Sequence, residues 1–284
     1  MIKQKAIIKK KELLAPDIYS MTFDTGLCSK AAPGQFVLVY PPNGAKLLGR
    51  PLCIAETGRS DGTDTLRIVF RAGGSGTGEI AACKEGTELY IEGPLGRGYP
   101  MEAAKDARNI VLIGGGIGAP SLLFLARALT GQASGGSQKQ SVAENAVPKA
   151  GSSSNITAVL GYRDSSLNSF LASDMEKTGI KVVTATDDGS LGVHGNVIDA
   201  MKTEGIRADL IYACGPMPML SAIKKYAKEQ GIAAYISLEE HMACGVGVCL
   251  GCVTNTTKED PHSHVKKARI CTEGPVFDAE DVDI

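Results

Sequence analysis

Residues 109–129 read NIVLIGGGIGAPSLLFLARAL, and this stretch decides the fold of the larger part of the chain. Residues 109–113 form a short apolar run, which is typical of a strand buried inside a parallel sheet. A turn rich in glycine follows, and residues 119–129 then show helical periodicity. A strand, a glycine turn and a helix in this order open a βαβ unit, so the sequence predicts an α/β domain.

The same alternation continues along the chain. Strand-like runs follow at residues 156–160, 180–185 and 210–213, with helical stretches between and after them, including residues 218–229. We therefore predict a parallel-sheet domain over residues 101–236. Residues 131–155 interrupt it, because they are rich in Ser, Gly, Ala and Gln and have almost no large apolar side chains. Such a segment cannot bury enough surface to order itself, which predicts a flexible surface insertion.

Residues 1–100 have a different pattern. Short alternating or apolar segments recur at residues 6–8, 18–23, 35–40, 65–70 and 88–92, and clusters of Pro and Gly separate them. Several short strands at this spacing predict a small antiparallel barrel or sandwich.

Four cysteines near the C-terminus carry the strongest chemical signal. Cys244, Cys249 and Cys252 have the spacing C-x4-C-x2-C, and Cys271 follows after eighteen further residues. This is the plant-type pattern of ligands to a [2Fe-2S] cluster. A structural zinc site is the alternative, although it normally shows two short and well-separated cysteine knuckles. We predict that residues 237–284 form a small module that packs on the α/β domain around this cluster.

Two turns of the α/β domain are candidates for nucleotide binding. Glycines in the turn at residues 114–118 let a backbone approach a pyrophosphate, and the next helix offers free N–H groups, although plain strand–helix packing also uses such turns. Cys214 ends a predicted parallel strand, where open α/β sheets bind ligands, or is simply a packing thiol. Arg163 would suit the 2′-phosphate of NADP and Asp164 a ribose hydroxyl of NAD, unless both are solvated strand-end residues.

The predicted barrel contributes two further candidates. Arg50 could neutralise a phosphate through its planar guanidinium. The glycine-rich loop at residues 73–78 could present backbone N–H groups to a pyrophosphate. Each of the two stretches could equally be an ordinary turn.

Composition excludes other function classes. A net charge of −1 gives no reason to expect nucleic acid as a partner, and no apolar run has the length of a membrane span. The N-terminus leads into a strand-like segment without the apolar core of a signal peptide, which favours a cytoplasmic location with reduced cysteines.

Taken together, these motifs resemble the ferredoxin–NADP reductase superfamily, in which an antiparallel flavin-binding barrel precedes a parallel-sheet nicotinamide-binding domain. Arg50-Pro51-Leu52-Cys53 resembles the family's Arg-x-Tyr/Leu-Ser flavin motif, with Cys53 in place of the usual Ser. The resemblance assigns the other cofactor-binding residues as follows: Val69, Phe70, Arg71, Gly76 and Thr77 to the flavin, and Gly114, Gly115, Gly116, Gly118, Cys214, Gly215 and Pro216 to the nicotinamide cofactor.

The run SLEEHMACG at residues 237–245 narrows the resemblance to the electron-transfer subunits of type B, NAD-dependent dihydroorotate dehydrogenases. His241 stands where that family often has Arg, and the insertion at residues 131–155 is longer than usual. The resemblance implies FAD, a [2Fe-2S] cluster on the four cysteines, and NAD. It also implies an FMN-containing catalytic dihydroorotate dehydrogenase subunit as the partner, in a heterotetramer of two plus two, and a chain that does not oxidise the substrate alone.

Two other interpretations remain. The small flavin and iron–sulfur subunits of NADPH–ferredoxin oxidoreductases and sulfide dehydrogenases share the architecture, but some of them carry a non-Cys cluster ligand, so four cysteines favour the orotate-linked family. A zinc-stabilised nucleotide-binding regulator without redox activity is the interpretation from another class.

Overall fold

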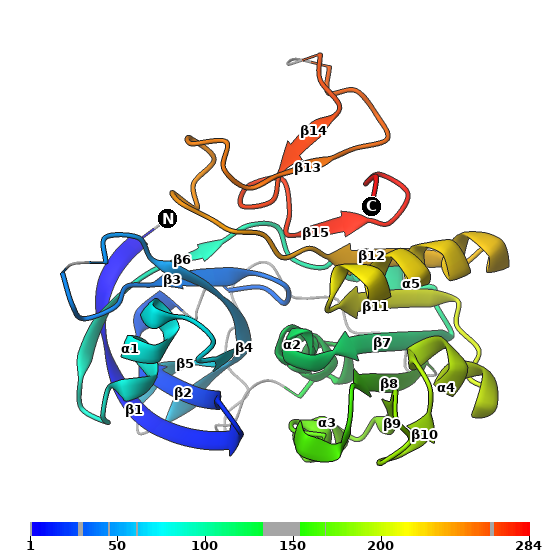
Figure 1. The fold of residues 1–284 in the computed structure, drawn as a ribbon, viewed down its shortest axis with the longest axis horizontal. Helices are drawn as coiled ribbons and strands as arrows, with labels where there is room; N and C mark the ends of the chain where they lie inside the picture. Colours follow the sequence, from blue (N-terminus) through cyan, green and yellow to red (C-terminus); the bar gives the residue numbers. More distant parts are fainter. Residues whose placement is uncertain are drawn as a thin grey trace.

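The computed structural model describes residues 2–27, 31–44, 46–60, 62–132, 154–167, 169–261 and 264–284. A barrel and a seven-stranded sheet lie side by side, and a smaller C-terminal segment extends from the top of both (Figure 1). Most of the predicted insertion at residues 131–155 lies outside the described residues. No helix in the described part of the chain is long and apolar enough to cross a membrane.

The N-terminal half is a closed antiparallel barrel with strand order β1-β2-β5-β4-β3-β6. Large apolar side chains such as Phe23, Ile68 and Ile91 fill its interior and are almost fully buried. The prediction of an antiparallel barrel is therefore confirmed. The strands are β1 (Ile2–Ala15), β2 (Ile18–Asp24), β3 (Phe36–Val39), β4 (Arg50–Ser60), β5 (Thr63–Arg71) and β6 (Glu88–Leu95).

The second half is a largely parallel sheet with strand order β10-β9-β8-β7-β11-β12-β15. Its strands are β7 (Asn109–Gly115), β8 (Asn155–Tyr162), β9 (Lys181–Thr186), β10 (Val193–His194), β11 (Leu210–Cys214), β12 (Ala233–Ser237) and β15 (Val276–Asp278). Its helices are α2 (Ala119–Thr130), α3 (Ala172–Glu176), α4 (Val197–Thr203) and α5 (Met217–Gln230). Three short 3₁₀ turns accompany them: Met101–Ala104, Gly116–Gly118 and Ser165–Leu167. The helices cover both faces of the sheet, with α2 on the barrel side (Figure 1), and the predicted α/β architecture is confirmed.

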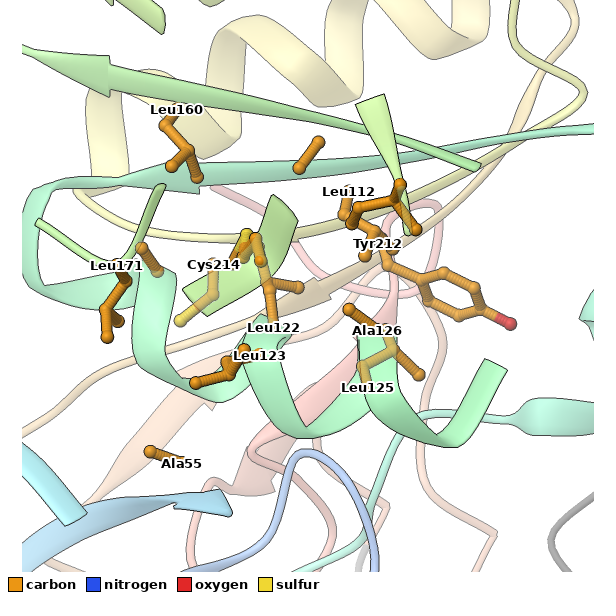
Figure 2. Packing of buried hydrophobic residues seen from close by; sticks show 14 of the residues in the cluster. Ala55, Leu112, Leu122, Leu123, Leu125, Ala126, Leu160, Leu171, Tyr212 and Cys214 are labelled. Carbon is orange, nitrogen blue, oxygen red and sulfur yellow. The ribbon is translucent and has the colours of Figure 1, made fainter. Parts of the chain in front are cut away.

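Helix α2 joins the two halves. Figure 2 shows Leu122 and Leu123 of α2 between Ala55 of β4 and Cys214 of β11, and all four side chains belong to one buried cluster. The helix is apolar on nearly every face because it packs on the sheet and on the barrel at once. The parallel-sheet half is thereby held against β4, the strand that carries the predicted flavin motif.

Half-buried charges reinforce this contact. Glu56 of the barrel forms an ion pair with Arg127 of α2 at 3.2 Å and accepts a hydrogen bond from Arg67 of β5 at 3.4 Å. Arg67 reaches in turn to Asp174 of α3 at 2.9 Å. These four side chains are only 15–20% exposed, so each pair is screened less than a surface ion pair.

Two parts of the structure differ from the predicted elements. The loop expected at residues 73–78 enters helix α1 (Ser75–Ala82), because Thr77 and Gly74 cap the helix start and Ile80 anchors the helix in the barrel core. The C-terminal segment forms a small hairpin of β13 (Val253–Asn255) and β14 (Lys267–Arg269), but its last strand, β15, pairs antiparallel with β12 at the edge of the large sheet.

Candidate cofactor and cluster sites

The predicted flavin residues Arg50, Gly76 and Thr77 meet at the N-terminus of α1. A Cβ atom built on Gly76 would lie 2.1 Å from Nε and 2.3 Å from Nη2 of Arg50, so the guanidinium lies flat against the bare backbone of the first helical turn. Nη1 of Arg50 donates to the carbonyl of Leu48 at 2.6 Å. A guanidinium beside the free N–H groups of a helix start forms a site suited to a phosphate.

The rest of the flavin motif lies on paired strands. Pro51 and Cys53 of β4 lie opposite Leu38 and Phe36 of β3 in the sheet register, with Leu52 between them. The neighbouring strand β5 carries Val69, Phe70 and Arg71, which the structure places differently from one another. The side chains of Val69 and Phe70 are buried in two apolar clusters, whereas Arg71 is exposed and lines a large cleft.

This cleft has a volume of about 870 Å³ and lies at the carboxyl ends of the parallel strands. Gly115, Gly116, Gly118, Gly215 and Pro216, all predicted nicotinamide-site residues, line it. Such a volume and position are those of a nucleotide site in an open α/β sheet.

Close contact between the turn at residues 114–118 and the turn after Cys214 explains why both contain glycine. A Cβ on Gly118 would lie 2.4 Å from the carbonyl oxygen of Cys214, and one on Gly115 would lie 2.7 Å from Cδ of Pro216. Gly114 and Cys214 are partners in the register of β7 and β11 and do not line the cleft. For Gly114 the packing interpretation therefore fits, since a Cβ there would meet the Cα and Cβ of Ala119 at 3.1 Å.

Several polar and titratable groups lie in or behind the cleft, and Cys214, Tyr99 and Ser121 among them are buried. Burial raises the pKa of the Cys214 thiol to about 12, and desolvation raises that of the half-buried Cys53 well above its usual value. Hydroxyls of Tyr99 and Ser121 lie 3.4 Å apart within this region. Desolvation in the cleft also raises the pKa of Glu239, a cleft-lining residue that the sequence did not single out although it falls within the diagnostic run at residues 237–245.

Arg163 and Asp164 both line the same cleft. The hydroxyl and backbone N–H of Ser166 donate to Asp164 and lower the pKa of its carboxyl group. Both residues are thus placed where a nucleotide could meet them, and the geometry does not separate the NAD from the NADP interpretation.

The cysteine loop turns backbone N–H groups towards sulfur. The Sγ of Cys244 accepts from the backbone N of Val246 at 3.5 Å and of Cys249 at 3.4 Å, and Cys249 Sγ accepts from Gly251 at 3.4 Å. Hydrogen bonds of this kind, the one from Val246 above all, lower the pKa of Cys244 to about 6. Gly247, with φ of +83°, supports the turn in a conformation that favours glycine.

The four thiols are arranged in pairs. Cys244 contacts Cys249, and Cys252 contacts Cys271, so the first pair lies towards the surface and the second is buried. Within the described ranges, no three His, Cys, Asp or Glu side chains converge on one point that could hold a single metal ion. Four cysteines arranged as two pairs suit the two irons of a [2Fe-2S] cluster.

The fold and these sites define a reductase of the ferredoxin–NADP reductase type with an added iron–sulfur module. A solved structure of an NADH-dependent reduced ferredoxin–NADP oxidoreductase, described in work on flavin-based electron bifurcation, is 27% identical and superposes with a TM-score of 0.79 over 98% of this chain and 89% of that one. Flavohemoglobin from Malassezia yamatoensis, at 18% identity and a TM-score of 0.56 over 83% of this chain and 60% of that one, shares the fold.

Comparison with sequence relatives identifies one family within this class of reductases. Residues 239–283 match the family model of the iron–sulfur cluster binding domain of dihydroorotate dehydrogenase B. The electron transfer subunit of dihydroorotate dehydrogenase B (NAD(+)) from Shouchella clausii is 37% identical over 97% of this chain and 96% of its own length. The subunits of that name from Bacillus cereus and Geobacillus thermodenitrificans are 35% and 33% identical, each over 99% of this chain and 99% and 98% of their own lengths. The chain belongs to this family of electron transfer subunits, as its resemblance predicted.

Proposed function

We propose that this chain passes electrons from a dihydroorotate-oxidising partner to NAD⁺ in pyrimidine biosynthesis, with FAD at the barrel and a [2Fe-2S] cluster on Cys244, Cys249, Cys252 and Cys271. When bound, the cluster carries single electrons, and the flavin accepts them singly and donates a hydride as a pair. The protein's part is to hold these groups close together, in order, and away from water.

One observation carries the proposal: the cysteine loop packs directly on the flavin-motif side of the barrel. A Cβ on Gly245 would lie 2.7 Å from Cδ1 of Leu38, so the loop touches β3 without a side chain between them. Leu38 is the register partner of Pro51 in the flavin motif. A cluster on this loop and a flavin on β4 are therefore neighbours, as one-electron transfer between them requires.

Each group of residues has a role in this proposal. Arg50 and the start of α1 hold the flavin pyrophosphate by charge and by N–H donors. The neutral thiol of Cys53 offers the weak S–H donor that replaces a hydroxyl in the flavin motif. The backbone turns at Gly115 and Gly215 keep the cleft open for the nicotinamide cofactor, and Asp164 takes the ribose of NAD.

The partner in this proposal is an FMN-containing catalytic subunit, in a cytoplasmic heterotetramer of two plus two. The name shared by the relatives, an electron transfer subunit, supports a partner of this kind. Val248 and Leu250, which flank Cys249, are 81% and 63% exposed. Apolar side chains beside an exposed cluster ligand suit a surface that a partner covers.

Co-expression with the catalytic subunit tests the proposal. We expect the two chains to co-purify with FMN and FAD in equal amounts, and we expect two copies of each chain by mass measurement. The chain purified alone should oxidise NADH with artificial acceptors and should not oxidise dihydroorotate. Orotate formation by this chain alone would overturn the subunit role, and a colourless protein with zinc and no iron would overturn the redox role altogether.

The structural likeness to an NADH-dependent ferredoxin–NADP oxidoreductase supports a second candidate, a small subunit of such an enzyme. The dihydroorotate-linked relatives are more similar in sequence, at 33–37% identity against 27%. Activity of the co-purified complex decides between them: reduction of NAD⁺ by dihydroorotate supports the first function, and reduction of NADP⁺ by reduced ferredoxin supports the second.

A further inference from the structure

Thr272, directly after the cluster ligand Cys271, has a buried hydroxyl without a partner. Its Oγ1 is shielded from solvent and makes no hydrogen bond with any atom of the described residues. A buried hydroxyl left unpaired costs about 1–3 kcal/mol, so protein interiors rarely keep one. An atom of this kind beside a ligand loop indicates that its partner is a group bound there.

Neighbouring polar groups are already paired with one another. The backbone N–H of Gly247 donates to the Sγ of Cys271, and the carbonyl of Gly247 accepts from Nη1 of Arg269 at 3.2 Å. Arg269 is held in turn by Glu273, through Nη2 at 2.8 Å and Nε at 3.1 Å. This network fixes the loop and leaves the Thr272 hydroxyl outside it.

The Thr272 side chain also lies on the cluster loop itself. A Cβ on Gly247 would lie 2.8 Å from Cγ2 and 3.2 Å from Oγ1 of Thr272, so this side chain packs on the backbone between Cys244 and Cys249. The backbone N of Thr272 donates to the carbonyl of Arg269 at 3.2 Å, which holds the residue in place. The loop that carries Cys244, Cys249 and Cys252 and the segment that carries Cys271 therefore meet at this hydroxyl.

We propose that the Thr272 hydroxyl donates a hydrogen bond to a sulfur atom of the bound cluster and raises its reduction potential. The inference rests on the proposed function, since it requires the cluster. Reduction adds negative charge to the sulfurs, and a donor stabilises that charge more than it stabilises the oxidised form. Thr272 thus tunes electron entry into the chain through direct contact with the cluster, without ligating iron.

Replacement of the hydroxyl by a methyl group tests the idea. In the complex co-purified with its catalytic partner, Thr272→Val keeps the shape and Thr272→Ser keeps the donor. A redox titration followed by the electron paramagnetic resonance (EPR) of the reduced cluster should place the valine variant at a more negative potential. We expect roughly a tenfold change in the ratio of reduced to oxidised cluster, or about 59 mV for one electron, with the serine variant at the wild-type potential.

Iron content and a second spectroscopic measurement keep the test decisive. An exchangeable proton coupled to the cluster, measured by electron–nuclear double resonance in H₂O and D₂O, should disappear in Thr272→Val and persist in Thr272→Ser. If the valine variant loads iron poorly, the smaller Thr272→Ala variant should show the same shift. An unchanged potential and an unchanged proton signal in a fully loaded valine variant would overturn the inference, whereas wild-type protein without iron would overturn the proposed function itself.

Discussion

Gly76→Ala should weaken flavin binding by displacing Arg50. A Cβ at this position would fall 2.1 Å from Nε, 2.3 Å from Nη2 and 2.4 Å from Cζ of Arg50, all far inside van der Waals contact. The backbone of α1 is held in the barrel by Ile80, so the flexible guanidinium is the group that moves. Once it moves, the charge no longer lies over the helix start.

The magnitude follows from the interaction that is lost. A hydrogen bond to a charged group contributes about 1.5–3 kcal/mol. Since about 1.4 kcal/mol corresponds to a tenfold change in affinity, the Kd for FAD should rise about 10- to 100-fold. The apoprotein should unfold at nearly the wild-type temperature, because the clash involves the end of a long side chain and leaves the core unchanged.

Gly78→Ala is the matched control, two residues further along the same helix. A Cβ on Gly78 meets nothing within 4 Å, so this variant should bind FAD normally and gain up to about 1 kcal/mol from helix propensity. Titration of deflavinated protein with FAD, followed by quenching of flavin fluorescence, measures both. Equal affinities of the two variants would refute the assignment of Arg50 and Gly76 to the flavin phosphates.

Three further variants test the other sites. Cys249→Ser should lose the iron signal in absorption and EPR spectra but largely keep FAD, because the flavin motif lies in the barrel; loss of both together would argue against that separation. Gly118→Ala places a Cβ 2.4 Å from the backbone carbonyl of Cys214, which cannot swing away, so we expect about 1–3 kcal/mol of destabilisation and weaker NADH binding, measured by thermal unfolding and calorimetry. Although burial opposes ionisation, Lys177 and Arg67 lower the pKa of Asp174. Its carboxylate therefore stabilises the fold above its unfolded pKa of about 3.9 and loses that contribution as the pH falls further. Asp174→Asn should cost about 1 kcal/mol near neutral pH and reduce the loss of stability on acidification, and wild-type denaturation curves that are identical at pH 7 and pH 3.5 would contradict this.

The sequence predicted the barrel and the α/β domain well because the apolar residues of each half follow one clear pattern. Apolar runs with glycine turns identified β7 and α2 almost to the residue. β4 was not predicted as a strand, since Pro51 and Gly58 interrupt its alternation and its pairing with β3 and β5 depends on residues distant in sequence. α1 was read as a loop because glycine is a poor helix former, and the cap formed by Thr77 is a local signal that composition hides.

For the sites, sequence patterns located the motifs but not the orientation of their side chains. The flavin motif includes Phe70, yet β5 turns that side chain into the barrel core, because alternate residues of a strand face opposite sides. Glu239 and Thr272 lie next to recognisable motifs in sequence, but only tertiary contacts show that one lines the cleft and that the other packs on the cysteine loop. No single-sequence pattern marks a hydroxyl that lacks a partner.

The position of the cysteine loop follows from connections on both sides of it. Residues 238–243 lead from the end of β12 into the loop, and residues 272–275 lead from Cys271 into β15, which pairs with β12 itself. The peptide N–H of Arg97, just beyond the barrel strand β6, donates to the carbonyl of Gly274 on this return segment. The loop is therefore fixed to the sheet through β12 and β15 and to the barrel through Arg97 and Leu38. Because electron transfer depends steeply on distance, two such anchors explain how so small a module, which has little apolar core of its own, can hold a cluster at a constant separation from the flavin motif.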